Sequence, residues 1–293
     1  MRPLNARLLL VPFLLFVSAC AGDPAPAPYP FPPQFVQVDQ IDPRVIAAPP
    51  TQNSVQYRTE IDGIIARQHS LTDADKATLM AEDHITPGMM IDPVLGKDYP
   101  EAKFPALYTL LRHAASDAWR LGDHEQDYWH RTRPWLTDNH VEILVSTIKR
   151  PSYPSGHSTT NHVWAHILGD LFPDHRDAFF KRAYEIGMHR TLAGVHYPSD
   201  VEAGKEFAAV IYAQMEKNPA FDKEYQAASD EIAAAMSASL PAKAIPDPAN
   251  DSPPVLNGAL PTPPAPPQCP PGMICTPIPP CPPGMICTPA PAK

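Results

Sequence analysis

The chain has 293 residues, and its 23 Lys and Arg against 32 Asp and Glu give a net charge of −9. This acidic balance argues against a general nucleic-acid binder, which would carry a basic face. Of the 40 prolines, 28 lie in residues 21–50 and 241–293, whereas all 12 histidines lie in 51–240. Pro-rich stretches bury too little apolar surface to fold. The sequence therefore predicts a single domain over 51–240 between two disordered flanks.

The first twenty residues have the features of an export signal. Two arginines precede an apolar run at 8–17, which is too short to span a bilayer as a helix. The run ends in Val-Ser-Ala-Cys, which resembles the lipobox of bacterial lipoproteins. The resemblance implies that residues 1–19 are removed and that Cys20 carries a lipid in the periplasm; Ala21 favours the outer membrane. An ordinary cleaved signal is the alternative. Residues 20–50 are then predicted to form a Pro-rich linker.

Helical periodicity dominates the central region. Apolar residues recur at three- and four-residue steps in four segments, which predicts amphipathic helices over 104–121, 158–171, 177–192 and 199–215. Ser199 is expected to cap the last helix, with Glu202 completing a capping box. Because no alternating strand pattern competes, we expect an all-α fold, a single helical bundle domain.

Three short segments carry residues suited to phosphate chemistry. They read Arg-Thr-Arg-Pro at 131–134, Tyr-Pro-Ser-Gly-His at 153–157 and Arg-Thr-Leu-Ala-Gly-Val-His-Tyr-Pro-Ser-Asp at 190–200. Arginine donates bidentately to phosphate oxygens, and a Ser-Gly pair at a helix start offers a hydroxyl and backbone N–H groups to an anion. Histidine transfers protons or attacks as a nucleophile near neutral pH, and an Asp four residues later can fix its tautomer.

The order RP…PSGH…R-x5-H-x3-D resembles the type 2 phosphatidic acid phosphatase superfamily, and looks closest to the bacterial class A non-specific acid phosphatases. The likeness runs over about 55–235. It implies an all-α phosphomonoester hydrolase with no metal and no cofactor. By matching position, His196 would be the nucleophile that forms a phosphohistidine, Asp200 would orient it, and His157 would protonate the leaving alcohol and later activate water. The residues implied to hold the phosphoryl oxygens are Arg133, Ser155, Gly156 and Arg190.

Two positions depart from this pattern. The family's first motif begins with a Lys seven residues before its Arg, where this chain has Gln126, and the usual Ser before the third-motif Arg is His189. Loss of one cationic contact to a phosphoryl group could cost a few kcal/mol, judged by the ~2.7–4 kcal/mol for one lost oxyanion donor. A working phosphatase is favoured because the other motif residues remain. The alternatives are a weakly active or non-catalytic anchored protein, a changed substrate, or replacement of the lost charge by Arg131, Lys149 or Arg150.

A vanadate-dependent haloperoxidase is a further alternative, because those enzymes share this phosphate cradle. They also use its Lys, so Gln126 counts against that interpretation. A lipid phosphate is a variant substrate, although no membrane-spanning helix is predicted in 51–240. Small soluble phosphomonoesters are therefore the expected substrates. Homo-oligomer formation stays open. His162 and His166 form an HxxxH pair without the Glu of zinc proteases, so no metal site is predicted.

The C-terminal region, 241–293, repeats the sequence CPPGMICTP at 269–277 and 281–289. An even number of cysteines outside the cytosol predicts two disulfides, with three connectivities open. A soft-metal site for Cu(I) is the less favoured alternative, since no His accompanies the repeat. The disulfide candidates are Cys269, Cys275, Cys281 and Cys287.

Overall fold

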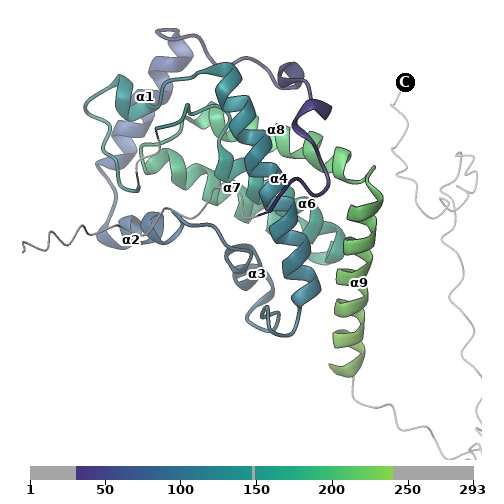
Figure 1. The fold of residues 1–293 in the computed structure, drawn as a ribbon. Helices are drawn as coiled ribbons and strands as arrows, with labels where there is room; N and C mark the ends of the chain where they lie inside the picture. The colour runs from purple at the N-terminus through teal and green to yellow at the C-terminus, as the bar shows by residue number, and fades with distance from the viewer. Residues whose placement is uncertain (1–30, 147–148, 240–293) are drawn as a thin grey trace, which may run out of the picture. The chain divides into compact units, whose positions relative to one another are not determined.

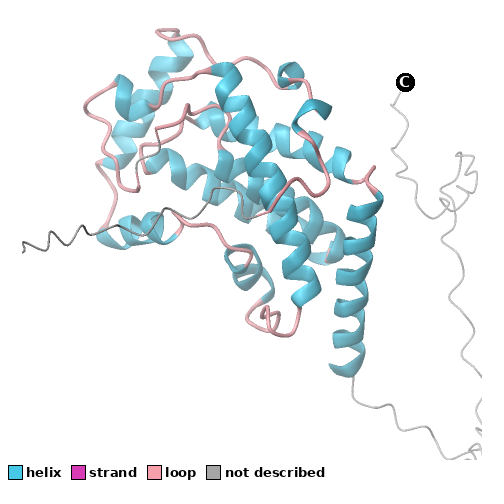
Figure 2. Cartoon of the chain, in the orientation of Figure 1, coloured by secondary structure: helices cyan, strands magenta, loops and turns pink. Residues whose placement is uncertain are grey.

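The computed structural model describes residues 31–146 and 149–239. The predicted signal and Cys20 lie outside these residues, as do the first part of the predicted linker and the tail with its four cysteines. Within the described part every regular element is helical, and the helices are joined by loops (Figure 2). The predicted all-α fold is thus confirmed.

The four helices predicted from periodicity are all present (Figure 1), at α4 (Pro105–Trp129), α6 (Gly156–Leu171), α7 (Arg176–Leu192) and α8 (Pro198–Met215). Helix α4 runs eight residues past the predicted end. The structure adds further α-helices and three short 3-10 turns. These are α1 (Val55–Gln68), α2 (Asp73–Ala81), α3 (Gly88–Leu95), α5 (Pro134–Thr137), α9 (Pro219–Ser239), η1 (Val38–Gln40), η2 (Pro43–Val45) and η3 (Pro173–His175).

Helix α6 is the centre of the domain, and it packs against α4, α7 and α8. Its first ten residues are all buried, including a run of polar side chains at 157–162. Several of these polar groups bond carbonyls one turn earlier: Thr159 Oγ1 donates to the Ser155 carbonyl at 3.0 Å, and Asn161 Nδ2 to the His157 carbonyl at 2.9 Å. Such back-bonding gives several side chains of this polar helix start an acceptor inside the core, whereas Thr160 Oγ1 and Asn161 Oδ1 are buried with no hydrogen-bond partner among the described residues.

The predicted cap of α8 is wrong by two residues. The helix begins after Tyr197, with Pro198 as its first residue and Ser199 already inside it. Proline suits this place because the first helical residue needs no N–H donor. The acidic residue that reaches back is Asp200, whose Oδ2 accepts from the Tyr197 N–H at 2.9 Å, and not Glu202.

Residues 31–50, which composition assigns to the linker, pack against the helical core. Asp117 in the middle of α4 anchors them, because its carboxylate accepts the backbone N–H groups of Gln34, Phe35 and Val36 at 2.7–3.1 Å. The folded region therefore begins before residue 51. The apolar side chains of this stretch that are buried in the core are Phe35, Val36, Ile41 and Ile46.

None of the helices within 31–146 and 149–239 has the length and apolar content needed to cross a bilayer.

Candidate active site

The three motif segments come together around the start of α6. Arg133 precedes α5, Ser155 caps the N-terminus of α6, and Arg190 lies in the last turn of α7. His196 lies in the short α7–α8 connection and Asp200 in the first turn of α8. All five are almost completely buried. Segments more than sixty residues apart in the chain thus form one polar cluster inside an apolar domain.

His196 is held by one ring nitrogen and leaves the other directed at an arginine. Its Nδ1 lies 2.8 Å from the Ser152 carbonyl and 3.3 Å from Asp200 Oδ2, and both groups only accept hydrogen bonds. The proton of the neutral ring is therefore on Nδ1. Nε2 is 3.4 Å from Arg133 Nη1 and keeps its lone pair. Burial and the charge of Arg133 lower the pKa of His196 to about 4, against the opposing effect of Asp200.

Asp200 is part of a buried chain of charges. Its Oδ1 pairs with Arg131 Nη1 at 2.5 Å, and Arg131 Nη2 pairs with Glu60 of α1 at 3.0 Å. The Arg131 guanidinium also lies 3.8 Å above the Tyr197 ring. Although burial opposes it, the charges of Asp200 and Glu60 raise the pKa of Arg131. The carboxylate that orients His196 is thus itself fixed by Arg131.

Arg133 is fixed by backbone carbonyls. Its Nε donates to the Arg150 carbonyl at 2.6 Å, Nη2 to Pro151 at 3.0 Å and Nη1 to Val195 at 2.9 Å. Arg150 and Pro151 directly precede Ser152, whose carbonyl lies against His196 Nδ1, and Val195 directly precedes His196. Arg133 therefore ties together the two stretches of chain that hold the His196 ring. Burial lowers its pKa to about 10, which leaves the guanidinium charged at neutral pH.

Arg190 has unused donors. Its Nη2 pairs with Asp83 Oδ1 at 2.9 Å, while its buried Nε and Nη1 have no hydrogen-bond partner among the described residues. A guanidinium carries five donors, and buried donors normally find acceptors. The side chain is only 1% exposed, so these donors face the protein interior. This is the arrangement expected of a group that binds an anion.

His157 lies beside the same arginine. Its Nε2 is 3.1 Å from the Asp83 carbonyl oxygen, which only accepts, so this nitrogen carries a proton. Its ring meets the edge of Trp119 at a centroid distance of 5.4 Å. Burial first, and then the charges of Arg190 and His196, lower the pKa of His157 well below its usual value. His157 is therefore neutral in the protein alone.

Ser155 and Gly156 shape the start of α6. Ser155 Oγ accepts from the Ser158 N–H at 3.3 Å, and the Ser155 N–H donates to the Asp200 carbonyl at 2.9 Å. Gly156 lies so close to the Trp119 ring that a Cβ there would overlap it. A glycine is thus required by the close approach of α4 to α6.

The departure at Gln126 is structurally accommodated. Gln126 is buried in α4, and its Nε2 donates to the Pro154 carbonyl at 2.9 Å. The three cations considered as replacements for the lost charge are paired with carboxylates or exposed. Arg131 is committed to two carboxylates, Arg150 pairs with Asp123 and Asp127, and Lys149 is exposed.

Sequence reasoning missed Glu60, Glu82 and Asp83. Glu82 Oε1 pairs with Arg182 at 2.7 Å, and its Oε2 with His189 at 2.6 Å. His189, the second departure, therefore faces a carboxylate next to the site. Acidic residues at 60, 82 and 83 lie outside every motif, and nothing in their spacing distinguished them. Their separation from their partners, 107 residues for Asp83 and Arg190, explains why.

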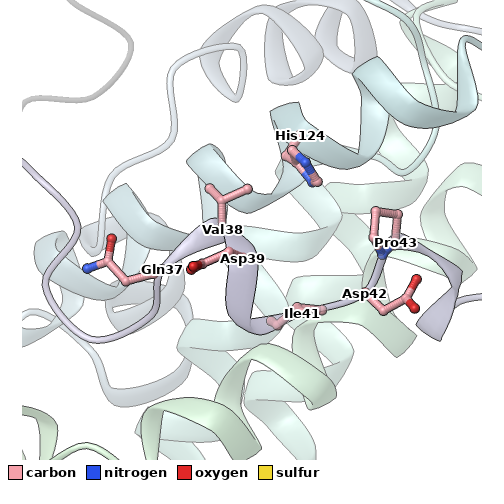
Figure 3. Close-up of a pocket in the computed structure, with 7 residues that line it drawn as sticks. All are labelled: Gln37, Val38, Asp39, Ile41, Asp42, Pro43 and His124. Atoms are coloured by element: carbon pink, nitrogen blue, oxygen red, sulfur yellow. The ribbon is translucent and has the colours of Figure 1, made fainter.

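An open surface pocket lies elsewhere, between the η1–η2 segment and His124 of α4 (Figure 3). Asp39 and Asp42 line it, and no motif residue does. Among residues 31–146 and 149–239, no three His, Cys, Asp or Glu side chains are gathered as a metal site needs.

Part of the chain is similar to known proteins. Residues 121–217 match the family model described as PAP2 superfamily. A non-specific acid phosphatase of Providencia stuartii is 32% identical over 146 residues, which are 48% of this chain and 57% of the relative. An acid phosphatase of Zymomonas mobilis is 26% identical over 200 residues, 65% of this chain and 75% of the relative. The resemblance to the superfamily and its acid phosphatases is confirmed.

The family match spans a third of the chain, and the chain spans 57–59% of the length of its relatives from Providencia and Salmonella. The crystal structure of a bacterial vanadium-dependent iodoperoxidase is also similar, with 19% identity, a TM-score of 0.46, and coverage of 59% of this chain and 51% of that chain.

Proposed function

We propose that this protein is a phosphomonoester hydrolase that works through a phosphohistidine on His196. The observation that carries the proposal is the environment of that ring. Nδ1 holds the proton against Ser152 and Asp200, while Nε2 keeps its lone pair 3.4 Å from a buried guanidinium. A nucleophile with a fixed tautomer next to cationic donors is what phosphoryl transfer requires.

The proposed reaction has two steps. Nε2 of His196 attacks phosphorus while the P–O bond to the alcohol breaks, and the departing oxygen takes a proton delivered by His157. Water then attacks phosphorus with His157 as base, the P–N bond breaks, and inorganic phosphate leaves. Arg133 and Arg190 balance the charge spread over the equatorial oxygens in both steps.

The neutral state of His157 fits this scheme if the substrate brings the proton. A phosphoryl group next to His157 raises its pKa because the added negative charge opposes the effect of Arg190. A monoanionic ester would therefore supply the proton on binding, and His157 would relay it to the leaving oxygen.

The test is turnover of p-nitrophenyl phosphate by the purified full chain, with and without EDTA. We expect EDTA-insensitive hydrolysis, vanadate inhibition, and loss of turnover in His196→Ala. His175→Ala is the matched control, because His175 is an exposed histidine on η3. Labelling with ³²P-ester should give an acid-labile adduct that is absent from His196→Ala. Full activity of His196→Ala would refute the assignment.

We propose in addition that the protein is lipid-anchored through Cys20 at the outer membrane and acts in the periplasm on small soluble phosphomonoesters. The lipobox-like sequence supports the anchor, and the acid phosphatase relatives support the substrates. Metabolic labelling with a palmitate analogue, lost in Cys20→Ala, tests the anchor. Thiol counting before and after reduction tests the proposed disulfides among the four tail cysteines.

A further inference from the structure

Asp83 contacts two of the motif residues although it lies outside every motif. It follows α2, in the connection to α3. Its Oδ1 is 2.9 Å from Arg190 Nη2, and its carbonyl oxygen is 3.1 Å from His157 Nε2. One residue therefore joins the arginine that has unused donors to the histidine that would protonate the leaving group.

The charge at Asp83 is well suited to imitate a phosphoryl oxygen. The Asp83 side chain is 10% exposed and that of Arg190 1%. Asp83 is the carboxylate that pairs with Arg190 in the described part of the chain. Burial raises the pKa of Asp83, but the hydrogen bond from Ser146 and the charge of Arg190 outweigh it, so the group stays ionised. An ionised acceptor on a buried guanidinium makes the same charge-assisted hydrogen bond as a phosphate oxygen.

The Glu82–Asp83 pair is held in place largely by polar contacts. Glu82 pairs with Arg182 and His189 of α7, and Asp83 Oδ2 accepts from the Ser146 N–H at 3.1 Å. The hydrogen bond between Asp83 and Ser146 is exposed, so water can replace it when the carboxylate moves. An incoming anion can thus take the place of the carboxylate on Arg190 while Glu82 keeps the chain attached to α7.

We propose, on the basis of the proposed function, that Asp83 holds the place of one phosphoryl oxygen on Arg190 Nη2, next to the unpaired Nε and Nη1, and that a phosphomonoester binds by displacing its carboxylate. Nη2 belongs to both two-donor edges of the guanidinium, so bidentate binding of a phosphoryl group needs this donor. Asp83 then sets the affinity of the site for phosphoryl groups. Binding of any anion at this place must break the Asp83–Arg190 ion pair, which costs free energy. Product phosphate is therefore bound less tightly than the two buried arginines alone would bind it. Asp83 is a specificity-determining residue in this scheme.

The first experiment measures binding of inorganic phosphate to the full chain by calorimetry, in the natural protein and in Asp83→Asn. We expect Asp83→Asn to bind phosphate at least about tenfold more tightly, because Arg190 loses its internal partner. Its Tm without phosphate should fall, and phosphate should raise that Tm more than in the natural protein. Asp92→Asn is the matched control: it removes an exposed carboxylate on α3 and should change neither value.

A second measurement needs no variant. If phosphate displaces Asp83, the Ser146 N–H loses its acceptor, so saturating phosphate should speed hydrogen exchange at Ser146 in the natural protein. Slower or unchanged exchange there would overturn the proposal. So would weaker or equal phosphate binding by Asp83→Asn, because Asp83 would then merely position Arg190.

These outcomes separate the inference from the proposed function. Turnover with a phosphohistidine, but no tighter phosphate binding in Asp83→Asn, refutes only the role of Asp83. Tight phosphate binding by Asp83→Asn without any turnover supports that role and refutes the phosphatase. If neither protein binds phosphate and the natural protein does not turn over p-nitrophenyl phosphate, both proposals fail.

Discussion

Two buried imidazoles decide at which pH the proposed reaction runs. His196 attacks only when neutral, and its pKa of about 4 keeps it neutral above that pH. His157 is also neutral in the protein alone, so the proton for the leaving group comes with the substrate monoanion. The second pKa of a phosphate ester is about 6. We therefore expect kcat/KM to fall below about pH 4 and again above about pH 6.

The measurement is the pH profile of kcat/KM for two esters that differ in their second pKa. The alkaline limb should move with the ester, while the acid limb should stay in place because it belongs to His196. An alkaline limb at the same pH for both esters would show instead that a protein group supplies the proton.

The substitution at position 126 gives a second prediction at the residue scale. Gln126 donates one uncharged hydrogen bond to the Pro154 carbonyl at the start of α6. We expect Gln126→Lys to raise kcat by about 100-fold or more, since one lost donor to a developing oxyanion costs about 2.7 kcal/mol or more. Gln126→Met, which removes the donor without adding charge, is the control. A rate unchanged by Lys would mean that position 126 does not reach the phosphoryl group.

Arg131 is expected to act through Asp200 and not on the substrate. Arg131→Met leaves Asp200 and Glu60 as buried carboxylates without their partner, which costs about 3–5 kcal/mol of stability. The unpaired Asp200 charge then raises the pKa of His196, so the acid limb of kcat/KM should move to higher pH. Urea unfolding and the pH profile measure the two effects. Arg131→Lys should restore part of the stability and part of the pH profile. If the acid limb of kcat/KM does not move in Arg131→Met, Arg131 does not act through Asp200.

At the scale of elements, α4 serves as the anchor for the segment before α1. Asp117 accepts hydrogen bonds from the backbone N–H groups of residues 34–36. No local sequence pattern predicts this contact. We expect Asp117→Ala to cost about 3–5 kcal/mol, because three backbone donors, two of them fully buried, lose their acceptor. The urea midpoint measures this loss. Asp127→Ala, on the same helix but with a side chain 64% exposed, should cost less than about 1 kcal/mol. Equal losses would contradict the anchoring role.

The helices with a clear apolar face were predictable, whereas their ends and caps were less so. Periodicity located α6 and α7 to within two residues, because the buried face of each helix appears in the sequence as apolar residues three and four positions apart. The cap of α8 was misplaced because Pro198 suits the first helical position and moves the start forward. The short helices α2, α3 and α5 carry too few turns for a periodic signal, so the sequence did not show them.

For the whole molecule, burial of neutral histidines predicts sensitivity to acid. His162 and His196 have pKa values lowered to about 4 by burial, and that of His157 is also strongly lowered. The unfolded chain binds protons at these residues near pH 6.5 while the folded protein does not. Stability is therefore fully present above that pH and falls as the pH drops toward 4.

The expected loss at pH 5 is about 2 kcal/mol for each of His162 and His196, relative to pH 8. Urea unfolding at both pH values measures it. His162→Gln removes one of these groups outside the proposed catalytic set, so its loss between pH 8 and pH 5 should be smaller. An equal loss in the variant would show that His162 is not held neutral by the fold.

The sequence by itself determined the helical class, the central helices and the residue types that phosphate chemistry needs, because these depend on short-range periodicity and on motifs of a few residues. The tertiary structure alone decided which groups surround those motifs. Three sets of contacts join positions about 70 to 110 residues apart in the chain: Asp83 with Arg190, Glu60 with Arg131, and residues 34–36 with Asp117. Charge pairing and burial at such separations arise only when helices pack, and no local pattern records them.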